Sequence, residues 1–301
     1  MSRVSVIVLS WNTAELTLEC LRSVQAAFKR GEAEGELVVV ENGSEDGSLE
    51  RISSEFPAAV LVKNDENLGY SVGVNQGVAA SSCDRLLLLG SDARLLEGAL
   101  SELVGFLDGA SGYGACAPRL VGEGGETQQA CAAFPRPKTA IWFGTPLQHW
   151  FPKSPELERY FLREFDHESD ADVEQPPATC LLLSRDVWDS LGGMDESLWL
   201  FFNDVDLCKR MQREGLLIRF LAGTRVQHVG GASTARFGTF VERWHTDRLR
   251  YMRKHHGFVG SLCARIGTTW AFAAWGLRRA FFRVRDPFWE RVGSYIRFLR
   301  A

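Results

Sequence analysis

Two acidic residues at the start of a predicted helix are the first candidates for chemistry. Asp204 and Asp206 lie in the first turn of a helix predicted over residues 204–214, where free backbone N–H groups favour carboxylates even without a function. Their side chains point about 200° apart on a helix, so we expect one to face a site and the other to brace the helix. The apolar run 198–202 would raise the pKa of the first and suit it as a general base.

Asp92 and His228 are the candidate ligands for a metal ion. Asp92 follows the predicted strand 85–89, and a carboxylate at a strand's carboxyl end can hold Mn²⁺ or Mg²⁺ against a diphosphate. His228 ends another predicted strand and precedes two glycines, which let a ligand approach the backbone closely. An isolated Asp is more often a helix cap and an isolated His a core or surface residue, so the two indicate a metal site only if they meet.

The first 110 residues alternate between predicted strands and helices. The runs 4–9, 37–40, 60–63 and 85–89 are apolar on both faces, which favours an α/β fold with a Rossmann-like, mostly parallel sheet flanked by helices. Asn12 and Glu15 predict a capping box at the first helix. Four polar loops, 10–12, 41–44, 64–69 and 90–92, follow the strands. Such loops are also ordinary turns, but at one sheet edge they predict a ligand site.

The second half of the chain is less regular. Residues 112–177 contain Trp and Phe between prolines and show poor periodicity, which predicts either a binding loop or a packed irregular excursion. A strand over 178–184, a short helix over 186–191 and extended segments over 218–222 and 225–228 follow.

The C-terminal region is basic. From residue 247 to 301 there are 12 Lys or Arg and three acids, so this region carries +9 and the remainder −13. The uncharged run 266–277 is shorter than the about 20 residues that span a bilayer. With Phe281, Phe282, Phe288 and Trp289 among arginines, it suits a helix on an anionic membrane surface. A helical hairpin packed on the catalytic domain or on a second subunit, as in a homodimer, fits equally well. Interleaved aliphatic residues argue against nucleic-acid binding.

Composition indicates a folded cytoplasmic protein. The chain has 301 residues, is 45% hydrophobic and holds seven cysteines without a CxxC pair, which suits a large core and reduced thiols. Its N-terminal apolar run is short and lacks a cleavage pattern, so secretion is not expected. Contact with the inner face of the cell membrane would come from the basic C-terminal region.

Six segments resemble a known enzyme family. In order, VSVIVLSWN, VVVENGSEDGS, NDENLGYSVGVNQGV, LLLLGSD, GGMDESLWLFFNDVDLCKR and HVGGAS are similar to motifs of family 2 glycosyltransferases with the GT-A fold, particularly the bacterial rhamnosyltransferase-like group. The resemblance covers about residues 4 to 235. It implies a GT-A domain over 1–240, with a nucleotide-binding half 1–110 and an acceptor half 111–240, and a helical C-terminal extension over 241–301.

The resemblance also implies roles for single residues. Asp204 matches the catalytic base. Asp92 matches the last acid of the metal-binding motif, and His228 matches a second contact to the metal or diphosphate. The implied nucleotide-sugar contacts are Ser10, Asn12, Glu41, Asn42, Asn67, Gly69, Asn75 and Ser91. Three positions depart from the family pattern: Gly90 stands for the first acid of the metal motif, Asn203 for a common Glu and Glu41 for a common Asp.

The implied activity is an inverting transfer of a sugar, with rhamnose as one candidate, from a dTDP- or UDP-linked donor. The acceptor would be a hydroxyl of a glycan or lipid-linked molecule in cell-surface polysaccharide synthesis. A non-catalytic nucleotide-sugar-binding or scaffold protein of the same fold is the alternative. Gly90 and Asn203 favour that alternative, whereas Asp92, Asp204 and His228 favour an enzyme.

Overall fold

The computed structural model describes residues 2–230, 240–282, 295 and 298. The chain divides into two compact units. The first contains Met1–Ala132, Asp166–Trp199 and Asn203–Arg236, and the second contains Ala133–Phe165, Leu200–Phe202 and Phe237–Ala301. All of the predicted site residues belong to the first unit. The predicted domain division at residue 240 stays a prediction.

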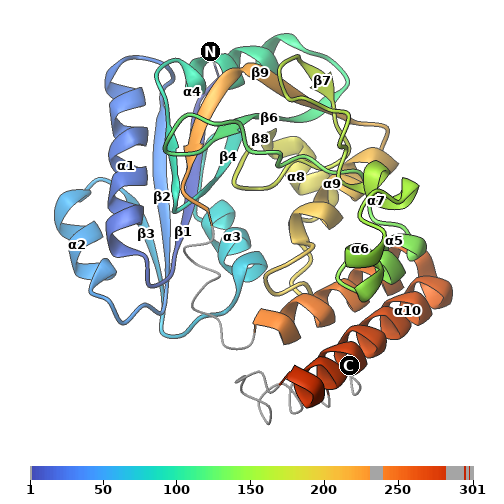
Figure 1. The fold of residues 1–301 in the computed structure, drawn as a ribbon. Coiled ribbons are helices and arrows are strands. Elements are labelled where there is room, and N and C mark those ends of the chain that lie inside the picture. Colours follow the sequence, from blue (N-terminus) through green and yellow to red (C-terminus); the bar gives the residue numbers. More distant parts are fainter. Residues whose placement is uncertain (1, 231–239, 283–294, 296–297, 299–301) are drawn as a thin grey trace. The chain divides into compact units, whose positions relative to one another are not determined.

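A single mixed sheet forms the centre of the first unit. In the described part of the chain, nine strands contribute to it, in the order β3-β2-β1-β4-β8-β6-β9-β5 with β7 on β9 (Figure 1). They are β1 Val4–Ser10, β2 Gly35–Asn42, β3 Val60–Asn64, β4 Arg85–Gly90, β5 Ala93–Leu95, β6 Tyr113–Val121, β7 Ala171–Asp172, β8 Cys180–Ser184 and β9 Leu217–His228. The first four are parallel, as predicted, and β8 pairs antiparallel with both β4 and β6.

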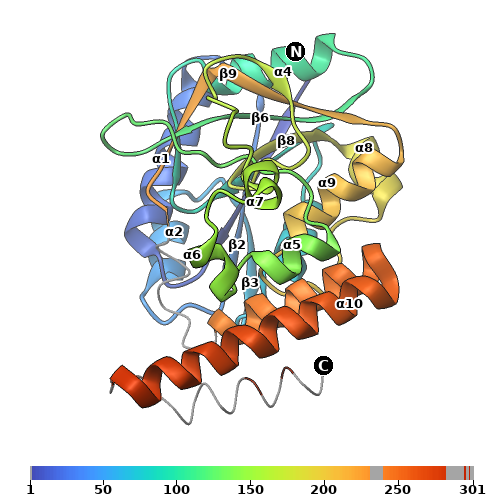
Figure 2. The ribbon, with the colours of Figure 1, turned by 45° about the vertical axis from the view of Figure 1, so that its right-hand side comes forward.

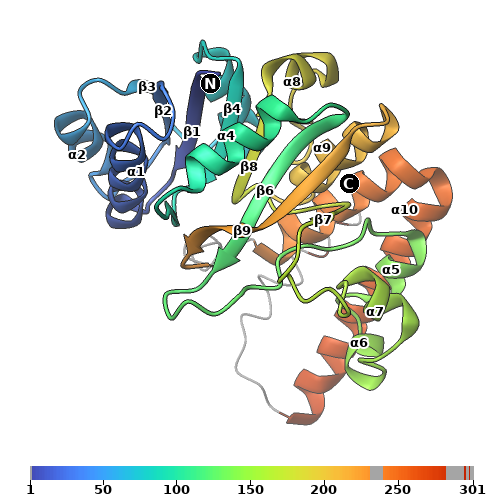
Figure 3. The ribbon, with the colours of Figure 1, turned by 90° about the horizontal axis from the view of Figure 1, so that it is seen from above.

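Helices cover both faces of this sheet. They are α1 Ala14–Lys29, α2 Ser48–Glu55, α3 Tyr70–Ala79, α4 Ala99–Gly109, α8 Arg185–Leu191 and α9 Asn203–Arg213. Val4, Val6 and Val8 point into a core shared with α1, α2 and α4, while Ile7 and Leu9 point at α3, where glycines 73 and 77 let the helix approach. This is the alternation of a strand buried on both faces. Figure 3 shows α1 and α4 on one face and α8 and α9 on the other.

Three expectations from the sequence need correction. The capping box is wrong: Thr13 is the N-cap of α1 without a side-chain cap bond, and Glu15 instead pairs with Arg51 of α2 at 2.7 Å. The segment 112–177 is more regular than predicted, because it contains β6, β7 and three short helices. The two extended segments after residue 217 form one strand, β9, whose register with β6 shifts near Pro118.

The second unit is helical. It holds α5 Pro137–Trp142, α6 Pro146–Trp150, α7 Pro155–Tyr160 and α10 Phe240–Phe282, with α5 lying along α10 (Figure 2). Gly257, at φ 57° and ψ −142°, divides α10 into two segments. The predicted C-terminal helix is thus present. Phe288, Trp289 and the side chains of Phe281 and Phe282 lie outside the described residues. No helix in the described part is long and apolar enough to cross a bilayer.

A buried arginine organises this unit. Arg248 is 1% exposed and donates to the carbonyl of Phe143 at 3.0 Å and to Thr268 Oγ1 at 2.7 Å, which joins α5 to both segments of α10. Its guanidinium lies 4.5 Å from the Trp244 ring and also donates to His245 Nδ1 at 3.2 Å. Burial and the Arg248 charge lower the pKa of His245 to about 3, so His245 acts as a neutral acceptor.

Candidate functional site

The carboxyl ends of the parallel strands bring the predicted loops together. Ser10 is in register with Glu41, Leu9 with Gly90 and Asn42 with Asn64. The loops that follow β1, β2, β3 and β4 therefore begin at one edge of the sheet, as the sequence predicts for a ligand site.

Asn42 holds the loop after β3. This fully buried side chain accepts hydrogen bonds at Oδ1 from Asn64 Nδ2 (3.0 Å) and from Leu68 N (3.2 Å). It also donates from Nδ2 to Asn67 Oδ1 at 3.0 Å, and Asn67 Oδ1 accepts from Gly69 N at 2.9 Å. A buried amide with several partners fixes the backbone around it. Asn42 and Asn67 thus shape this loop, and their contacts to a nucleotide sugar stay predictions.

Asn12 and Glu41 shape the loop after β2. Glu41 is 2% exposed and accepts from Ser44 N at 2.9 Å. Asn12 Oδ1 accepts from Glu45 N at 2.9 Å, while Asn12 N donates to Ser44 Oγ at 2.9 Å. Asn12 has φ 52°, a left-handed conformation that asparagine tolerates better than most residues. The first two loops therefore form one hydrogen-bonded unit.

A row of hydroxyl groups links Ser10 to Ser91. Ser10 Oγ lies 3.0 Å from Thr17 Oγ1, and Thr17 Oγ1 lies 3.1 Å from Thr13 Oγ1. Thr13 Oγ1 lies 3.2 Å from Ser91 Oγ. All four residues are buried. The sequence indicated the two serines, whereas the threonines look like ordinary positions in the first turn of a helix. Only the fold shows that they connect the first loop to the fourth.

Asp92 and His228, 136 positions apart in the sequence, lie side by side. β5 pairs antiparallel with β9, so that Ala93 faces His228, and Asp92 Oδ1 lies 3.6 Å from His228 Nε2. A Cβ at position 90 would lie 3.1 Å from Asp92 Oδ1. Gly90, the first departure from the family pattern, therefore leaves room for this carboxylate.

Gln128 sets the tautomer of His228. Its Nε2 donates to the His228 carbonyl at 2.8 Å, which turns its Oε1 toward His228 Nδ1, also at 2.8 Å. An amide oxygen only accepts, so Nδ1 carries the proton and Nε2 is left with a lone pair. Two acceptors, Nε2 and Asp92 Oδ1, then face each other, and a shared proton or a cation between them would remove their repulsion. Sequence reasoning missed Gln128, which lies in the irregular region.

The Asp92–His228 pair fits a divalent cation. Carboxylate and imidazole are suitable ligands for Mn²⁺, and Gln128 supplies the outer hydrogen bond that a metal-binding imidazole normally has. Among the described residues, no cluster of three or more His, Cys, Asp or Glu is placed to hold a metal. A cation at this pair would therefore take its other ligands from diphosphate oxygens or water.

Asp204 and Asp206 have different surroundings, and the role of Asp204 as a base stays a prediction. Asp206 is fully buried and pairs with Arg210 at 2.8 Å, so it braces α9. Asp204 is partly exposed and accepts from Val205 N at 2.8 Å and from Ala178 N at 3.3 Å. Although the residue as a whole is partly exposed, desolvation of its carboxyl group raises the pKa of Asp204, while these N–H groups act to lower it. Asn203 Oδ1 accepts from Asp204 N at 2.7 Å, and asparagine suits such a helix start.

Tyr70 is a site residue that sequence reasoning missed. Its hydroxyl donates to the Ala178 carbonyl at 3.4 Å, and the N–H of Ala178 contacts Asp204. Burial raises the pKa of Tyr70, and the charges of Asp204 and Asp92 raise it further. The phenol is therefore within electrostatic reach of both carboxylates. An aromatic residue directly after Gly69, at the start of α3, was the available signal.

Asn75 holds the turn before α9. Its Oδ1 accepts from Met194 N at 2.9 Å, and its Nδ2 donates to the Met194 carbonyl at 3.0 Å and to Glu196 Oε1 at 2.9 Å. A Cβ at Gly193, where φ is 75°, would lie 2.8 Å from Asn75 Oδ1, so this turn requires glycine. Contact between Asn75 and a donor stays a prediction.

Gly69 lies where α3 meets a distant segment. Its φ is 91°, and a Cβ there would lie 2.6 Å from Trp199 Cδ1. The N–H of Tyr70 donates to the Trp199 carbonyl at 2.7 Å. The start of α3 is thus packed against Trp199.

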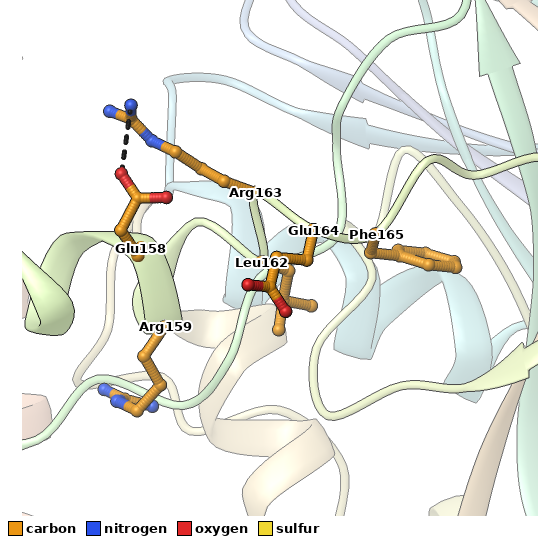
Figure 4. Close-up of a pocket in the computed structure, with 6 residues that line it drawn as sticks. All are labelled: Glu158, Arg159, Leu162, Arg163, Glu164 and Phe165. Atoms are coloured by element: carbon orange, nitrogen blue, oxygen red, sulfur yellow. Dashed lines mark ion pairs between the residues drawn. The ribbon is translucent and has the colours of Figure 1, made fainter. Parts of the chain in front are cut away.

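The second unit has a hollow of its own. It measures about 550 Å³ and is lined by Glu158, Arg159, Leu162, Arg163, Glu164 and Phe165 (Figure 4). Glu158 pairs with Arg163 at 3.4 Å, and Arg159 bonds to Glu156 at 2.7 Å. Both arginines of the hollow are thus engaged by glutamates of the same unit, so the hollow does not resemble the polar site of the first unit.

Solved structures share this fold. The chain superposes on the mannosyltransferase PcManGT from Pyrobaculum calidifontis, solved in complex with GDP-Man and Mn²⁺, with a TM-score of 0.56 and 15% identity over 100% of this chain and 81% of that one. The structure of GalNAc-T7 with UDP, GalNAc and Mn²⁺ superposes with a TM-score of 0.54 and 15% identity, over 89% of this chain and 55% of that one. The fold is the GT-A fold of glycosyltransferases, as predicted.

Sequence comparison gives the family. The model of Glycosyl transferase family 2 matches residues 5–166, more than half of the chain. The chain belongs to this family and is a glycosyltransferase, EC 2.4.

Curated relatives are consistent with this family. The N-acetylglucosaminyl-diphospho-decaprenol L-rhamnosyltransferase of Mycobacterium tuberculosis is 26% identical over 73% of this chain and 71% of its own length. The low-salt glycan biosynthesis hexosyltransferase Agl10 of Haloferax volcanii is 21% identical over 86% of this chain and 77% of its own length. The predicted likeness to the rhamnosyltransferase-like group is confirmed.

Proposed function

We propose that this glycosyltransferase moves a sugar, with rhamnose as the first candidate, from a dTDP- or UDP-linked donor to a hydroxyl of a glycan or lipid-linked acceptor, with inversion. The name of the mycobacterial relative supports the sugar and the acceptor class. The observation that carries the proposal is that one unit holds both a partly exposed carboxylate of raised pKa, Asp204, and the Asp92–His228 pair. A base and a site for the leaving diphosphate are the two parts this reaction needs.

Asp204 is the proposed base. The acceptor oxygen forms a bond to the anomeric carbon as the bond from that carbon to the diphosphate oxygen breaks. The hydroxyl proton passes to Asp204, and the electron pair of the broken bond stays on the diphosphate. The N–H groups of Val205 and Ala178 hold the carboxylate in one orientation, and its raised pKa makes it a stronger base than an ordinary aspartate.

Asp92 and His228 are the proposed ligands of a divalent cation, Mn²⁺ or Mg²⁺. Bound there, the cation would stabilise the negative charge that grows on the leaving diphosphate. Mn²⁺ in two structures of the same fold supports a divalent cation, and the 3.6 Å between Asp92 Oδ1 and His228 Nε2 supports these two ligands. Gln128 accepts a hydrogen bond from Nδ1 of His228 and so leaves Nε2 turned toward Asp92.

The loops at the strand ends are the proposed donor site. Ser10, Asn12, Glu41 and Asn42 would surround the base and ribose, and the remaining predicted contacts would lie beside the diphosphate. Those remaining contacts are Asn67, Gly69, Asn75 and Ser91. Several of these side chains are bonded to one another, so we expect them to act mainly by fixing the backbone that the donor meets.

Replacing Asp204 by Asn tests the proposal. We expect at least a 100-fold loss of turnover, the lower range for a lost general base, with nucleotide binding retained. Thermal shifts with UDP, dTDP and GDP, each with and without Mn²⁺, measure binding, and transfer of labelled sugar measures turnover. Asp186→Asn, an exposed acid in the first turn of α8, is the matched control. Retained turnover in Asp204→Asn would refute the role of Asp204.

A non-catalytic nucleotide-sugar-binding or scaffold protein is the second candidate. It is favoured by Gly90 and by Asn203, which places a neutral amide where the family commonly has an acid. The same assay separates the two candidates, because a binding protein would show thermal shifts with nucleotides but no transfer by the wild-type chain.

We also propose a cytoplasmic location, which seven free thiols support, and contact with the inner face of the cell membrane through residues 245–301. A homodimer through the same region stays the alternative use of these helices.

A further inference from the structure

The second segment of α10 is apolar on both of its faces. The face directed into the second unit is made of small residues, and Gly260, Ala264 and Gly267 lie there. A Cβ at Gly267 would lie 2.1 Å from the Ala140 carbonyl oxygen, so this face packs directly on α5. Helices that are apolar all round are normally covered on every side.

The opposite face is apolar and exposed. Phe258 is 79% exposed, Leu262 44%, Ile266 48% and Leu277 62%. The exposed positions 258, 262, 266, 269, 273 and 277 recur at helical spacing. Five of them are apolar, and the sixth, Thr269, accepts a hydrogen bond from Tyr295 at 2.9 Å. They form a stripe about 30 Å long at 1.5 Å per residue. We call these six positions the α10 stripe.

The surroundings of the α10 stripe fit a lipid surface. Trp150 of α6 is 65% exposed and its ring lies 6.0 Å from that of Trp270, which by helical period lies beside the stripe. Tryptophan is enriched at membrane–water interfaces. Residues 248–282 contain seven Lys or Arg and no Asp or Glu. Of these, Arg248 is buried inside the unit and Arg250 pairs with Asp247 at 3.6 Å, whereas Arg253 and Lys254 are exposed a few positions before Phe258.

We propose that the α10 stripe lies in the interface of an anionic bilayer, parallel to the membrane plane, with its Phe, Leu and Ile side chains among the acyl chains. Apolar residues on one face together with nearby cations are the properties of an interfacial helix. A second copy of this chain fits the stripe less well, because a symmetric contact would bring two cationic segments together. The stripe lies within residues 245–301, so this contact and its purpose, access to a lipid-linked acceptor, rest on the proposed function.

Vesicle sedimentation with the full chain tests the proposal. We expect binding to vesicles of phosphatidylcholine with phosphatidylglycerol, weaker binding to phosphatidylcholine alone, and at least a tenfold lower partition coefficient for the double variant Leu262→Ser/Ile266→Ser. Leu217→Ser, at a side chain that is 46% exposed in the first unit, is the matched control and should bind like the wild type. Thermal midpoints and nucleotide-induced shifts verify that the variants are folded.

Two results would overturn the proposal. The first is equal vesicle binding by the wild type and the double variant. The second is a wild-type dimer that the double variant converts to a monomer without any change in vesicle binding, which would assign the stripe to a second copy. Transfer to an acceptor without a lipid is measured separately. Lost vesicle binding with retained transfer would concern this proposal alone, and lost transfer with retained vesicle binding would concern the proposed function alone.

Discussion

Replacing Gln128 by Leu should weaken binding of Mn²⁺ without touching either proposed ligand. Gln128 holds the imidazole through two hydrogen bonds of 2.8 Å, one to Nδ1 and one to the His228 carbonyl. Leucine has a similar size but cannot accept the Nδ1 proton, so the ring can rotate and carry its proton on Nε2. Loss of such an outer partner lowers metal affinity by about 10- to 100-fold, or about 1.4 to 2.7 kcal/mol.

Titration of the protein with Mn²⁺ in the presence of UDP or dTDP, followed by the electron paramagnetic resonance signal of free Mn²⁺, measures this affinity. Gln129→Leu, at the exposed neighbouring position, controls for the loss of an amide from the same loop. Asp92→Asn should weaken binding further than Gln128→Leu, because it removes a ligand. Wild-type affinity in Gln128→Leu, with a normal thermal midpoint, would refute the tautomer argument. Failure of Mn²⁺ to bind the wild type would instead favour a shared proton between Asp92 and His228.

Two other perturbations follow from the hydrogen bonds of each unit. Tyr70→Phe removes the hydrogen bond to the Ala178 carbonyl and should lower kcat with little change in donor affinity; an unchanged kcat would contradict a role for the phenol. Folding lowers the pKa of His245, so the unfolded chain binds a proton at a higher pH than the folded chain. The free energy of unfolding should therefore fall as the pH drops below about 6.5, by up to about 1.4 kcal/mol per pH unit. His245→Asn keeps an acceptor for Arg248, and an unchanged slope of thermal midpoint against pH would exclude His245 as the cause.

The pH dependence of turnover has a defined sign. Asp204 must be deprotonated to act as a base, and burial raises its pKa, so the acidic limb should lie above the value of about 3.9 of an ordinary aspartate. Loss of activity on acidification should therefore begin at a higher pH than an exposed aspartate would give.

Local patterns were enough to predict the first half of the fold. Four apolar runs separated by polar loops predict β1, β2, β3 and β4, and no predicted strand end lies more than two residues from the observed one. Strands buried on both faces leave such a strong signal because nearly all of their residues are apolar. β6 was missed because Gly114 and Pro118 interrupt its pattern, and β9 was divided at Gly223. Glycine and proline weaken a strand pattern locally, while pairing with neighbouring strands restores the strand in the folded chain.

The sequence by itself determined which residue types stand at the strand ends and at the start of α9, and so indicated Asp92, Asp204 and His228. Only the tertiary structure decided that His228 meets Asp92, because that contact depends on the register of β5 against β9. It also placed Gln128 behind the imidazole and Tyr70 near Asp204. Sequence periodicity reports on neighbours within a few residues, whereas these contacts join segments about 100 or more positions apart, and packing of the whole sheet fixes them.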